Sequence, residues 1–219
     1  MTADETWSLV VPVKVLTRAK SRLAALAGAQ RPALALALAA DTVRAVLACP
    51  DVRQVIVVTD DELAAAELGQ LGAVVVGDEP GAGLNPALVY GAAWAASRAP
   101  RSGIGALSAD LPALTPAEMG RALRLAARWP QAIVPDATGT GTTLYTARPG
   151  VPFEPRFGPS SRQRHLDGGA HEIARGDVPG LRRDVDTAAD LGEAADLGLG
   201  PATAALAAQL LPDRGRTPH

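Results

Sequence analysis

The segment Ile104–Pro112, which reads IGALSADLP, constrains the fold of this chain more than any other stretch. Four of its first five residues are apolar or glycine, which is typical of a strand buried in a core. Because Pro112 has no amide hydrogen to give to a sheet, the strand is expected to end near Asp110. The sequence therefore predicts a carboxylate at the carboxyl end of a central strand, where open α/β sheets bind ligands. Such a carboxylate suits a divalent cation, although an aspartate there can also bond only the backbone of its own turn.

Apolar segments alternate with helical segments along the chain, which favours a largely parallel sheet. The expected strands are Trp7–Val15, Gln54–Val58, Ala73–Val76, the segment ending near Asp110, Gln131–Pro135, Leu144–Thr146 and a short strand within Leu181–Asp186. The expected helices are Arg31–Ala48, Glu62–Leu71, 84–97, 116–128 and one that follows Thr187. No linker, repeat or change of composition divides the chain, so we predict one α/β domain over 1–219 with flexible ends at 1–5 and about 212–219.

The composition argues against several classes of partner. A formal net charge of −2 and a pI of about 5.9 provide no basic field for nucleic acid, and an aromatic content of 3% gives few rings for stacking on bases. No uninterrupted apolar run reaches the roughly 18 residues of a membrane-spanning helix. The single cysteine, Cys49, excludes an internal disulfide and a cysteine-built zinc site. We therefore expect a cytoplasmic protein that binds neither nucleic acid nor membranes.

Four cationic side chains lie within nine residues, from the end of the first expected strand into the segment that follows it: Lys14, Arg18, Lys20 and Arg22. Loops that follow the strands of α/β sheets often bind phosphate, so this segment is interpreted as a cationic loop over a polyphosphate. The alternative is an ordinary solvated loop, which is the usual role of a run of charges. The position directly after the first strand favours the phosphate interpretation.

Three further loops are rich in glycine, amide and hydroxyl groups. The segment 81–85 places Asn85 at a helix start and can meet a base or ribose, or simply supply positive φ angles. The segment 136–143, DATGTGTT, offers amides and hydroxyls for a phosphate or carboxylate, unless it is only a hairpin turn. In 157–165, Ser160 and Ser161 can cap a helix and bond an anion.

A second group of acids lies in the segment that reads RRDVDTAADL. In an extended chain, Asp184 and Asp186 point to the same face. Adjacent carboxylates repel unless a cation lies between or beside them. The next helix is expected to start at Thr187, with Asp190 at its third position. The alternative is that all three acids cap helices or face solvent.

These segments follow one another over most of the chain as VPVK with AKSRL, the GLN loop, SADLPAL, GTGT, FGPSS and DVDTAADL. In this order the chain resembles the guanylyltransferases that make the activated three-carbon phosphoester used to build coenzyme F420. The actinobacterial members use phosphoenolpyruvate, and the archaeal members are assigned 2-phospho-L-lactate. The resemblance implies a nucleotide-diphospho-sugar transferase fold, which is a Rossmann-like three-layer α/β sandwich with a mostly parallel mixed sheet. The chain departs from that broader fold because the segment 14–22 replaces its Gly-rich phosphate loop.

The resemblance also implies roles for particular residues. Asp110 would ligate Mg²⁺ together with a later acid, with Asp184 as the first choice and Asp186 as the second. Phosphoenolpyruvate would be held by Thr142, Gly158 and Ser161. The nucleotide would be bound by Lys14, Arg18, Lys20, Arg22, Gly83 and Asn85, and the expected catalytic set is Lys14, Lys20 and Asp110. The resemblance leaves room for a homodimer and for a transient contact with the next enzyme of the pathway.

The implied reaction joins GMP to a phosphorylated acid. A phosphate oxygen of the acid attacks the α-phosphorus of GTP, and pyrophosphate leaves. Because the attacking group is already an anion, no general base is needed. One alternative is a nucleotidyltransferase for a molybdopterin or a sugar phosphate, although Arg162 and Arg164 favour an acidic substrate. Another is a noncatalytic nucleotide-binding module. The choice of GTP rests on the resemblance, as does that of phosphoenolpyruvate, which the GC-rich character of the composition also favours.

Overall fold

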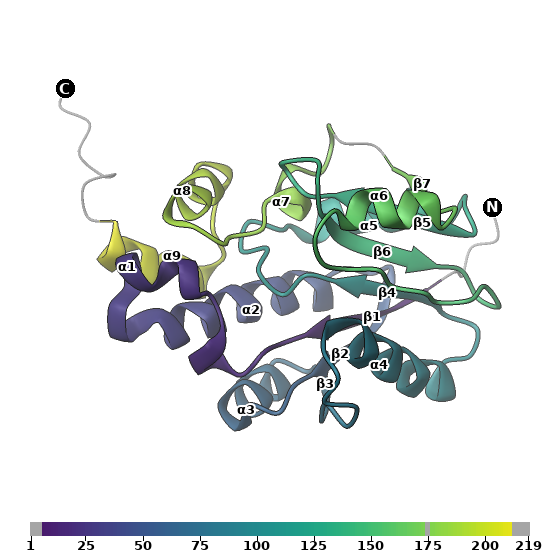
Figure 1. Cartoon of the computed structure of the whole chain (residues 1–219), viewed down its shortest axis with the longest axis horizontal. Coiled ribbons are helices and arrows are strands. Elements are labelled where there is room, and N and C mark those ends of the chain that lie inside the picture. Colours follow the sequence, from purple (N-terminus) through teal and green to yellow (C-terminus); the bar gives the residue numbers. More distant parts are fainter. Residues whose placement is uncertain (1–5, 174–175, 212–219) are drawn as a thin grey trace.

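A seven-stranded sheet crosses the computed structural model, which describes residues 6–173 and 176–211 (Figure 1). The strands are β1 (Trp7–Pro12), β2 (Val52–Val58), β3 (Val74–Val76), β4 (Gly103–Leu107), β5 (Gln131–Pro135), β6 (Thr142–Ala147) and β7 (His171–Glu172). Their order in the sheet is β3-β2-β1-β4-β6-β5-β7, with β6 antiparallel to both neighbours and the other pairs parallel. The mostly parallel, mixed sheet predicted from the sequence is confirmed. The expected flexible ends, 1–5 and 212–219, lie outside the described residues.

Helices connect and cover these strands. They are α1 (Ala24–Ala27), α2 (Arg31–Leu47), α3 (Glu62–Gln70), α4 (Leu84–Arg98), α5 (Pro116–Ala126), α6 (Ser161–Asp167), α7 (Pro179–Arg182), α8 (Ala188–Leu197) and α9 (Pro201–Leu210), with short 3-10 helices η1 (Leu16–Arg18), η2 (Ser21–Leu23) and η3 (Gly28–Gln30). Two predicted helix starts carry complete capping boxes, Thr115 with Glu118 and Thr187 with Asp190. The role predicted for Asp190 at its helix start is therefore confirmed.

Both faces of the sheet are buried, which gives three layers. Alternate residues of β1 point to opposite sides: Leu9 and Val11 join the core that includes α2, α3 and α5, whereas Val10 joins the core that includes α4. Every residue from Trp7 to Val11 is buried, as the apolar sequence of this strand predicted. The layered α/β fold is thus as expected, with β1 and β4 at its centre.

Parallel pairing brings the carboxyl ends of β1 and β4 to the same end of the sheet. In this pair Val10 lies opposite Ala106, so the segments that leave both strands emerge side by side. The antiparallel β6 begins at the same end, because the backbone N–H of Ser108 donates to the carbonyl of Thr143 at 2.9 Å. Three loops from distant parts of the sequence therefore meet there.

Some boundaries differ from the predictions. β1 ends at Pro12 rather than Val15, and β4 ends at Leu107, so Asp110 lies on the loop beyond the strand. The short strand predicted within Leu181–Asp186 is wrong, because α7 occupies its first residues. Pro179 favours a helical first turn, and the N–H of Gly180 donates to Glu118 Oε1 at 2.7 Å, which anchors that turn on α5.

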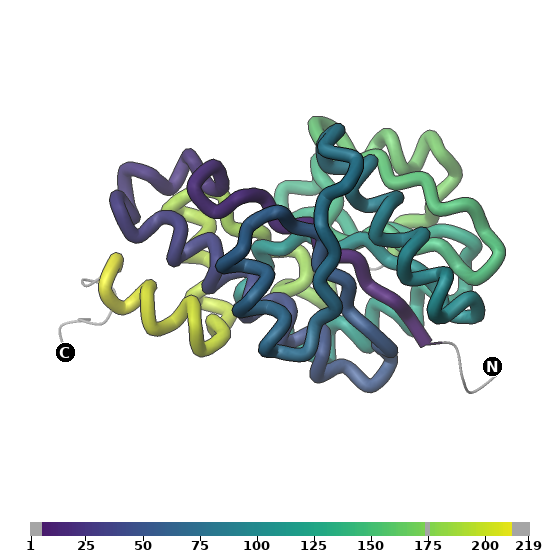
Figure 2. Tube along the Cα trace, turned by 90° about the horizontal axis from the view of Figure 1, so that it is seen from below, coloured from purple at the N-terminus to yellow at the C-terminus, as the bar shows by residue number. Residues whose placement is uncertain are grey.

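A smaller cluster joins α9 to α1 and α2, which lie side by side in both views (Figure 2). The buried Asp41 carboxylate of α2 accepts the backbone N–H groups of Ala202 and Thr203 at 3.1 and 2.7 Å. A Cβ on Gly200 would lie 2.4 Å from Cγ of Asp41, so glycine permits this approach. The N–H of Gly200 also donates to the carbonyl of Pro112 at 2.8 Å, which ties α9 to the loop that carries Asp110.

The stretch Ser21–Leu47 is long and apolar enough, by length and composition alone, to cross a membrane. Its helical path is interrupted at Gly28, where φ is 50°. Within α2, the side chains of Leu34, Leu38 and Val43 are fully buried in the protein. These contacts make α2 a core helix of this fold.

Candidate active site

A pocket of about 340 Å³ opens at the carboxyl ends of β1 and β4. Its charged lining comprises Lys14, Arg18, Lys20, Arg22, Asp110 and Asp186. Leu84 and Leu88 of α4, together with Phe157, contribute apolar lining. The structure therefore brings the whole predicted cationic segment together with two of the predicted acids.

A second hollow, of about 780 Å³, lies at the amino-terminal ends of the same strands. Its lining consists of Thr6, Arg53 and residues 98–102. None of the described residues in that lining is a carboxylate or a predicted site residue. Chemistry rather than size therefore selects the smaller pocket as the candidate active site.

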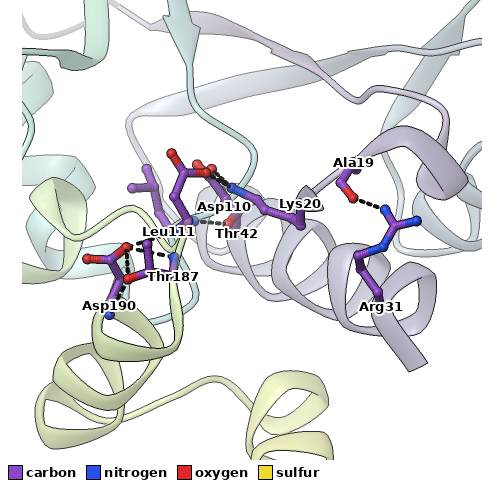
Figure 3. A network of polar contacts seen from close by, with 9 residues as sticks. Ala19, Lys20, Arg31, Thr42, Asp110, Leu111, Thr187 and Asp190 are labelled. Atoms are coloured by element: carbon purple, nitrogen blue, oxygen red, sulfur yellow. Dashed lines mark hydrogen bonds and ion pairs between the residues drawn. The ribbon is translucent and has the colours of Figure 1, made fainter. Parts of the chain in front are cut away.

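The Lys20 ammonium lies between two acids from different loops. Its Nζ donates to Oδ2 of Asp110 (Figure 3) and, at 2.8 Å, to Oδ1 of Asp186. The backbone of Lys20 is left-handed, with φ of 54°, which is uncommon for a residue with a side chain. Arg31 supports the preceding turn, because its guanidinium donates to the carbonyls of Thr17 and Ala19. The loop therefore aims one cation at the acids.

The loop that carries Asp110 is held from two sides. The backbone N–H of Val185 donates to the carbonyl of Asp110 at 3.1 Å, which ties this loop to the later acidic segment. The Thr42 hydroxyl of α2 accepts the N–H of Leu111 at 2.9 Å (Figure 3). Oδ1 of Asp110 is buried and has no hydrogen-bond partner among residues 6–173 and 176–211. Such an oxygen is costly to leave unpaired and is a natural ligand for a bound cation.

Three pKa values reflect this crowding of charge. Burial lowers the pKa of Lys20, but Asp110 and Asp186 outweigh it and raise the pKa to about 12. Burial raises the pKa of Asp186, yet the Lys20 ammonium holds it below the ordinary aspartate value. Asp184 has the opposite shift: burial, and then the negative charges of Asp110 and Asp136, raise its pKa to about 7. One ammonium therefore leaves this acidic cluster incompletely neutralised.

The donor set fits a divalent metal, although the acids are not preassembled around one position. Within the described part of the chain, no three His, Cys, Asp or Glu side chains form a group spaced to hold a metal ion. The Lys20 ammonium lies between Asp110 and Asp186, where it separates their oxygens. The unpaired oxygen of Asp110 and the raised pKa of Asp184 both favour an added cation. Metal ligation by Asp110, Asp184 and Asp186 stays a prediction.

The three residues predicted to hold the acid lie in a network beside the pocket. Thr142 Oγ1 and His165 Nδ1 are 3.1 Å apart, which links β6 to α6. The N–H of Ser161 donates to the carbonyl of Gly158 at 3.1 Å. Phe157, the residue before Gly158, lines the pocket and connects this network to it. The network is therefore adjacent to the pocket rather than part of its wall.

The two arginines that favoured an acidic substrate have different surroundings. Arg162 is engaged in an ion pair, in which its Nε lies 2.5 Å from Oε2 of Glu172. The guanidinium of Arg164 lies against Gly158, since a Cβ there would be 2.9 Å from Nη2. Arg164 is therefore the better placed of the two to meet an anion near Gly158.

The side chain of Asn85 bonds the backbone of Phe157, and its predicted contact with the nucleotide stays a prediction. Its Oδ1 accepts the N–H of Phe157 at 2.8 Å, and its Nδ2 donates to the carbonyl of the same residue at 3.1 Å. Gly83 has φ of 101° and open space where a side chain would be. Its freedom suits a turn before α4, and its predicted contact with the nucleotide stays a prediction.

Two residues at the site had no predicted role. Arg31 donates to the backbone carbonyls of Thr17 and Ala19, and no sequence pattern predicts contacts of this kind. His165 joins the Thr142 network, and its spacing was a usable signal. It lies four residues after Ser161, which places both on one face of the helix.

Several solved structures share the fold of this chain. A protein from Desulfovibrio desulfuricans G20 described as a candidate nucleotide-diphospho-sugar transferase matches with a TM-score of 0.73 at 16% identity, covering 95% of this chain and 97% of that one. A 4-diphosphocytidyl-2C-methyl-D-erythritol synthase matches with a TM-score of 0.59 at 13% identity, covering 89% and 99%. Rv0371c of Mycobacterium tuberculosis H37Rv, solved in complex with manganese, matches with a TM-score of 0.52 at 20% identity, covering 88% and 98%. These likenesses confirm the predicted nucleotide-diphospho-sugar transferase type of fold.

Sequence comparison gives the family. The model for "Guanylyl transferase CofC like" proteins matches residues 7–204, and the chain belongs to this family. The phosphoenolpyruvate guanylyltransferase of Thermomonospora curvata is 63% identical over 208 residues, which cover 95% of this chain and 91% of the relative. The enzyme of the same name from Streptomyces coelicolor is 56% identical over 206 residues, covering 94% and 97%. The resemblance drawn from the sequence motifs is confirmed.

We predict that Asp184→Asn raises the free energy of unfolding, and raises it more at pH 8 than at pH 5. With a pKa near 7 in the folded state and an ordinary value in the unfolded chain, Asp184 binds more protons when folded across that interval. Its contribution to stability is therefore fully present at low pH and is lost as pH rises through 7. Urea unfolding at several pH values measures the difference, with the exposed Glu67→Gln as the matched control. An increase in the free energy of unfolding that does not depend on pH would show that the pKa of Asp184 is not raised in the folded protein.

Proposed function

We propose that this protein is a phosphoenolpyruvate guanylyltransferase, which transfers GMP from GTP to phosphoenolpyruvate and releases pyrophosphate. The names of its relatives support the substrates. The observation that carries the proposal is the meeting of Lys20, Asp110 and Asp186 in one pocket at the carboxyl end of the sheet. A site of this kind is suited to joining two phosphorylated molecules, because it offers cations for phosphates and acids for a metal.

The cationic segment would bind the phosphates of GTP. Lys14, Arg18, Lys20 and Arg22 all line the pocket, so they can oppose the charge that develops on the leaving pyrophosphate. The apolar side chains of Leu84 and Leu88 line the same pocket and offer a surface for the nucleoside. The attacking phosphate oxygen is an anion, and the product would be enolpyruvyl-diphospho-guanosine. Positioning and neutralisation of charge therefore account for the chemistry without a general base.

Asp110, Asp184 and Asp186 would hold Mg²⁺. The buried, unpaired oxygen of Asp110 and the incompletely neutralised acids support a divalent cation, and hard carboxylate oxygens match magnesium. When bound, the ion would neutralise phosphate charge and orient the reacting groups. Lys20 contacts two of these acids, Asp110 and Asp186. When the metal and the nucleotide bind, its ammonium group could turn from the acids to the phosphates.

Thr142, Gly158 and Ser161 would hold phosphoenolpyruvate beside this centre. The hydroxyl of Thr142 and the guanidinium of Arg164 at Gly158 support an acidic ligand there. Phe157 lines the pocket and directly precedes Gly158, which supports binding of the acid next to the nucleotide. A cytoplasmic location and a step in the assembly of coenzyme F420 belong to the same proposal.

We predict that the purified protein releases pyrophosphate from GTP with phosphoenolpyruvate and Mg²⁺, and does so faster than with 2-phospho-L-lactate. The assay pairs each acid with GTP and with ATP, and mass spectrometry identifies the product. Faster turnover of 2-phospho-L-lactate would reassign the acid. Binding of GTP without pyrophosphate release from either acid would indicate a binding module instead.

Asp110→Asn is expected to lower turnover by about 100-fold or more. The substitution removes a charged carboxylate ligand of the metal, and a neutral amide oxygen is a poor replacement for it. The fold should persist, since the backbone contacts of this loop to Val185 and Thr42 do not involve the carboxylate. Steady-state kinetics and circular dichroism measure the two effects. The control is Glu67→Gln on the exposed face of α3, which should retain normal turnover. An Asp110→Asn enzyme with nearly normal turnover would remove this acid from the active site.

A further inference from the structure

The hydrogen bonds of His165 determine which of its ring nitrogens carries the proton. The backbone N–H of Arg156 lies 2.8 Å from Nε2, and a backbone N–H can only donate. Nε2 must therefore accept and is unprotonated. In a neutral imidazole the single proton then resides on Nδ1.

The surroundings of the ring keep it neutral. His165 is 1% exposed, with the ring of Tyr145 stacked at 4.8 Å and that of Phe157 edge-on at 5.2 Å. Burial, together with the charges of Arg164 and Arg156, lowers the pKa of His165 to about 4, although a backbone hydrogen bond with Ser161 acts in the opposite direction. A second proton on the ring is therefore disfavoured at neutral pH.

A proton on Nδ1 fixes the direction of the Thr142 hydroxyl. Nδ1 lies 3.1 Å from Oγ1 of Thr142, and a protonated nitrogen can only donate in this contact. Oγ1 must then accept, which leaves the hydroxyl hydrogen free to point elsewhere. Thr142 is the first residue of β6, at the end of the sheet where Ser108 bonds to the neighbouring Thr143.

The same ring also holds the loop that leads to Gly158. Backbone N–H groups of this loop donate to three side chains: Glu154 to the Tyr145 hydroxyl at 3.2 Å, Arg156 to His165 Nε2 at 2.8 Å and Phe157 to Asn85 Oδ1 at 2.8 Å. The accepting side chains belong to β6, α6 and α4. His165 is the member of this set that also contacts Thr142, so it couples the loop to the hydroxyl.

We propose that His165 is a positioning residue that orients the Thr142 hydroxyl as a hydrogen-bond donor to the acidic substrate and fixes the loop before Gly158. The proposal rests on the proposed function, in which Thr142 and Gly158 bind phosphoenolpyruvate. Because Nδ1–H donates to Oγ1, the hydroxyl hydrogen is not used in the contact with the ring and can be given to a phosphate or carboxylate oxygen of the substrate. His165 would not touch the substrate itself.

Kinetics of two substitutions test the proposal. In His165→Gln the amide oxygen can replace Nε2 as the acceptor for Arg156, but the donor to Thr142 is lost; in His165→Asn the amide NH₂ lies closer to the position of Nδ1 and can keep that donor. We expect His165→Gln to raise KM for phosphoenolpyruvate about tenfold, with KM for GTP changed less than about twofold. The rise for His165→Asn should be smaller than for His165→Gln.

A double-substitution cycle separates positioning from general structural damage. Thr142→Val removes the hydroxyl with little change of shape, and it should raise KM for phosphoenolpyruvate about as much as His165→Gln does. Adding His165→Gln to Thr142→Val should produce little further rise. Additive effects, or equal rises in KM for both substrates, would overturn the proposal. A wild-type protein inactive with phosphoenolpyruvate would instead reject the proposed function, and this inference with it.

The proton position can be measured in the unmodified protein. Long-range ¹H–¹⁵N spectra of the wild type with ¹⁵N-labelled histidine, assigned by comparison with His165→Gln, should show the Nδ1–H tautomer of His165, unchanged between pH 5.5 and 8. An Nε2–H tautomer, or protonation of His165 within that range, would overturn the proposal whatever the kinetics show.

Discussion

The candidate active site depends on the ion pairs that Lys20 makes with Asp110 and Asp186. These residues are 90 and 166 positions from Lys20 in the sequence, and the ammonium is largely buried. Removing the ammonium would leave carboxylates facing each other in a partly buried place, where repulsion and desolvation both oppose their charge. Asp184 already has a pKa of about 7 for the same reasons. The cluster is therefore stable with one cation and still favours another, a balance suited to a site that takes up a metal with its nucleotide.

The sheet topology delivers this arrangement. The parallel pairs place the carboxyl ends of β1 and β4 together, and the antiparallel β6 adds its beginning to the same end of the sheet. Hydrogen bonds from backbone N–H groups then fix the loops: Val185 donates to the carbonyl of Asp110, Gly200 to the carbonyl of Pro112 and Gly180 to Oε1 of Glu118. The loops that carry the acids are thus held by hydrogen bonds that do not use the carboxylates of Asp110 and Asp186. Beside the pocket, His165 contacts the hydroxyl of Thr142 and accepts the N–H of Arg156, so it holds these two segments together.

The sequence predicted most of the fold because its signals were local. The apolar strand at Trp7, the capping box at Thr115 and the Pro at the first turn of α2 each specify their own element, and all three are confirmed. The strand predicted within Leu181–Asp186 is wrong because tertiary contacts favour a helical turn at its start. Gly180 fits against the carbonyl of Ala113 and bonds Glu118, neither of which is near in sequence. The meeting of Lys20 with Asp110 was expected only in outline. The positions of Arg31 and the proton of His165 depend on partners that no local pattern specifies.

The most direct test of the central claim is a measurement of Mn²⁺ binding in the presence of GTP. The readout is the decrease in the EPR signal of free Mn²⁺. If the acids and the cationic segment form one metal-nucleotide site, the wild type binds the ion, and Asp110→Asn and Asp186→Asn each weaken binding by about tenfold or more. Glu67→Gln should bind as the wild type does. Undiminished Mn²⁺ binding in both active-site variants would contradict the account, because the ion would then be held by other residues.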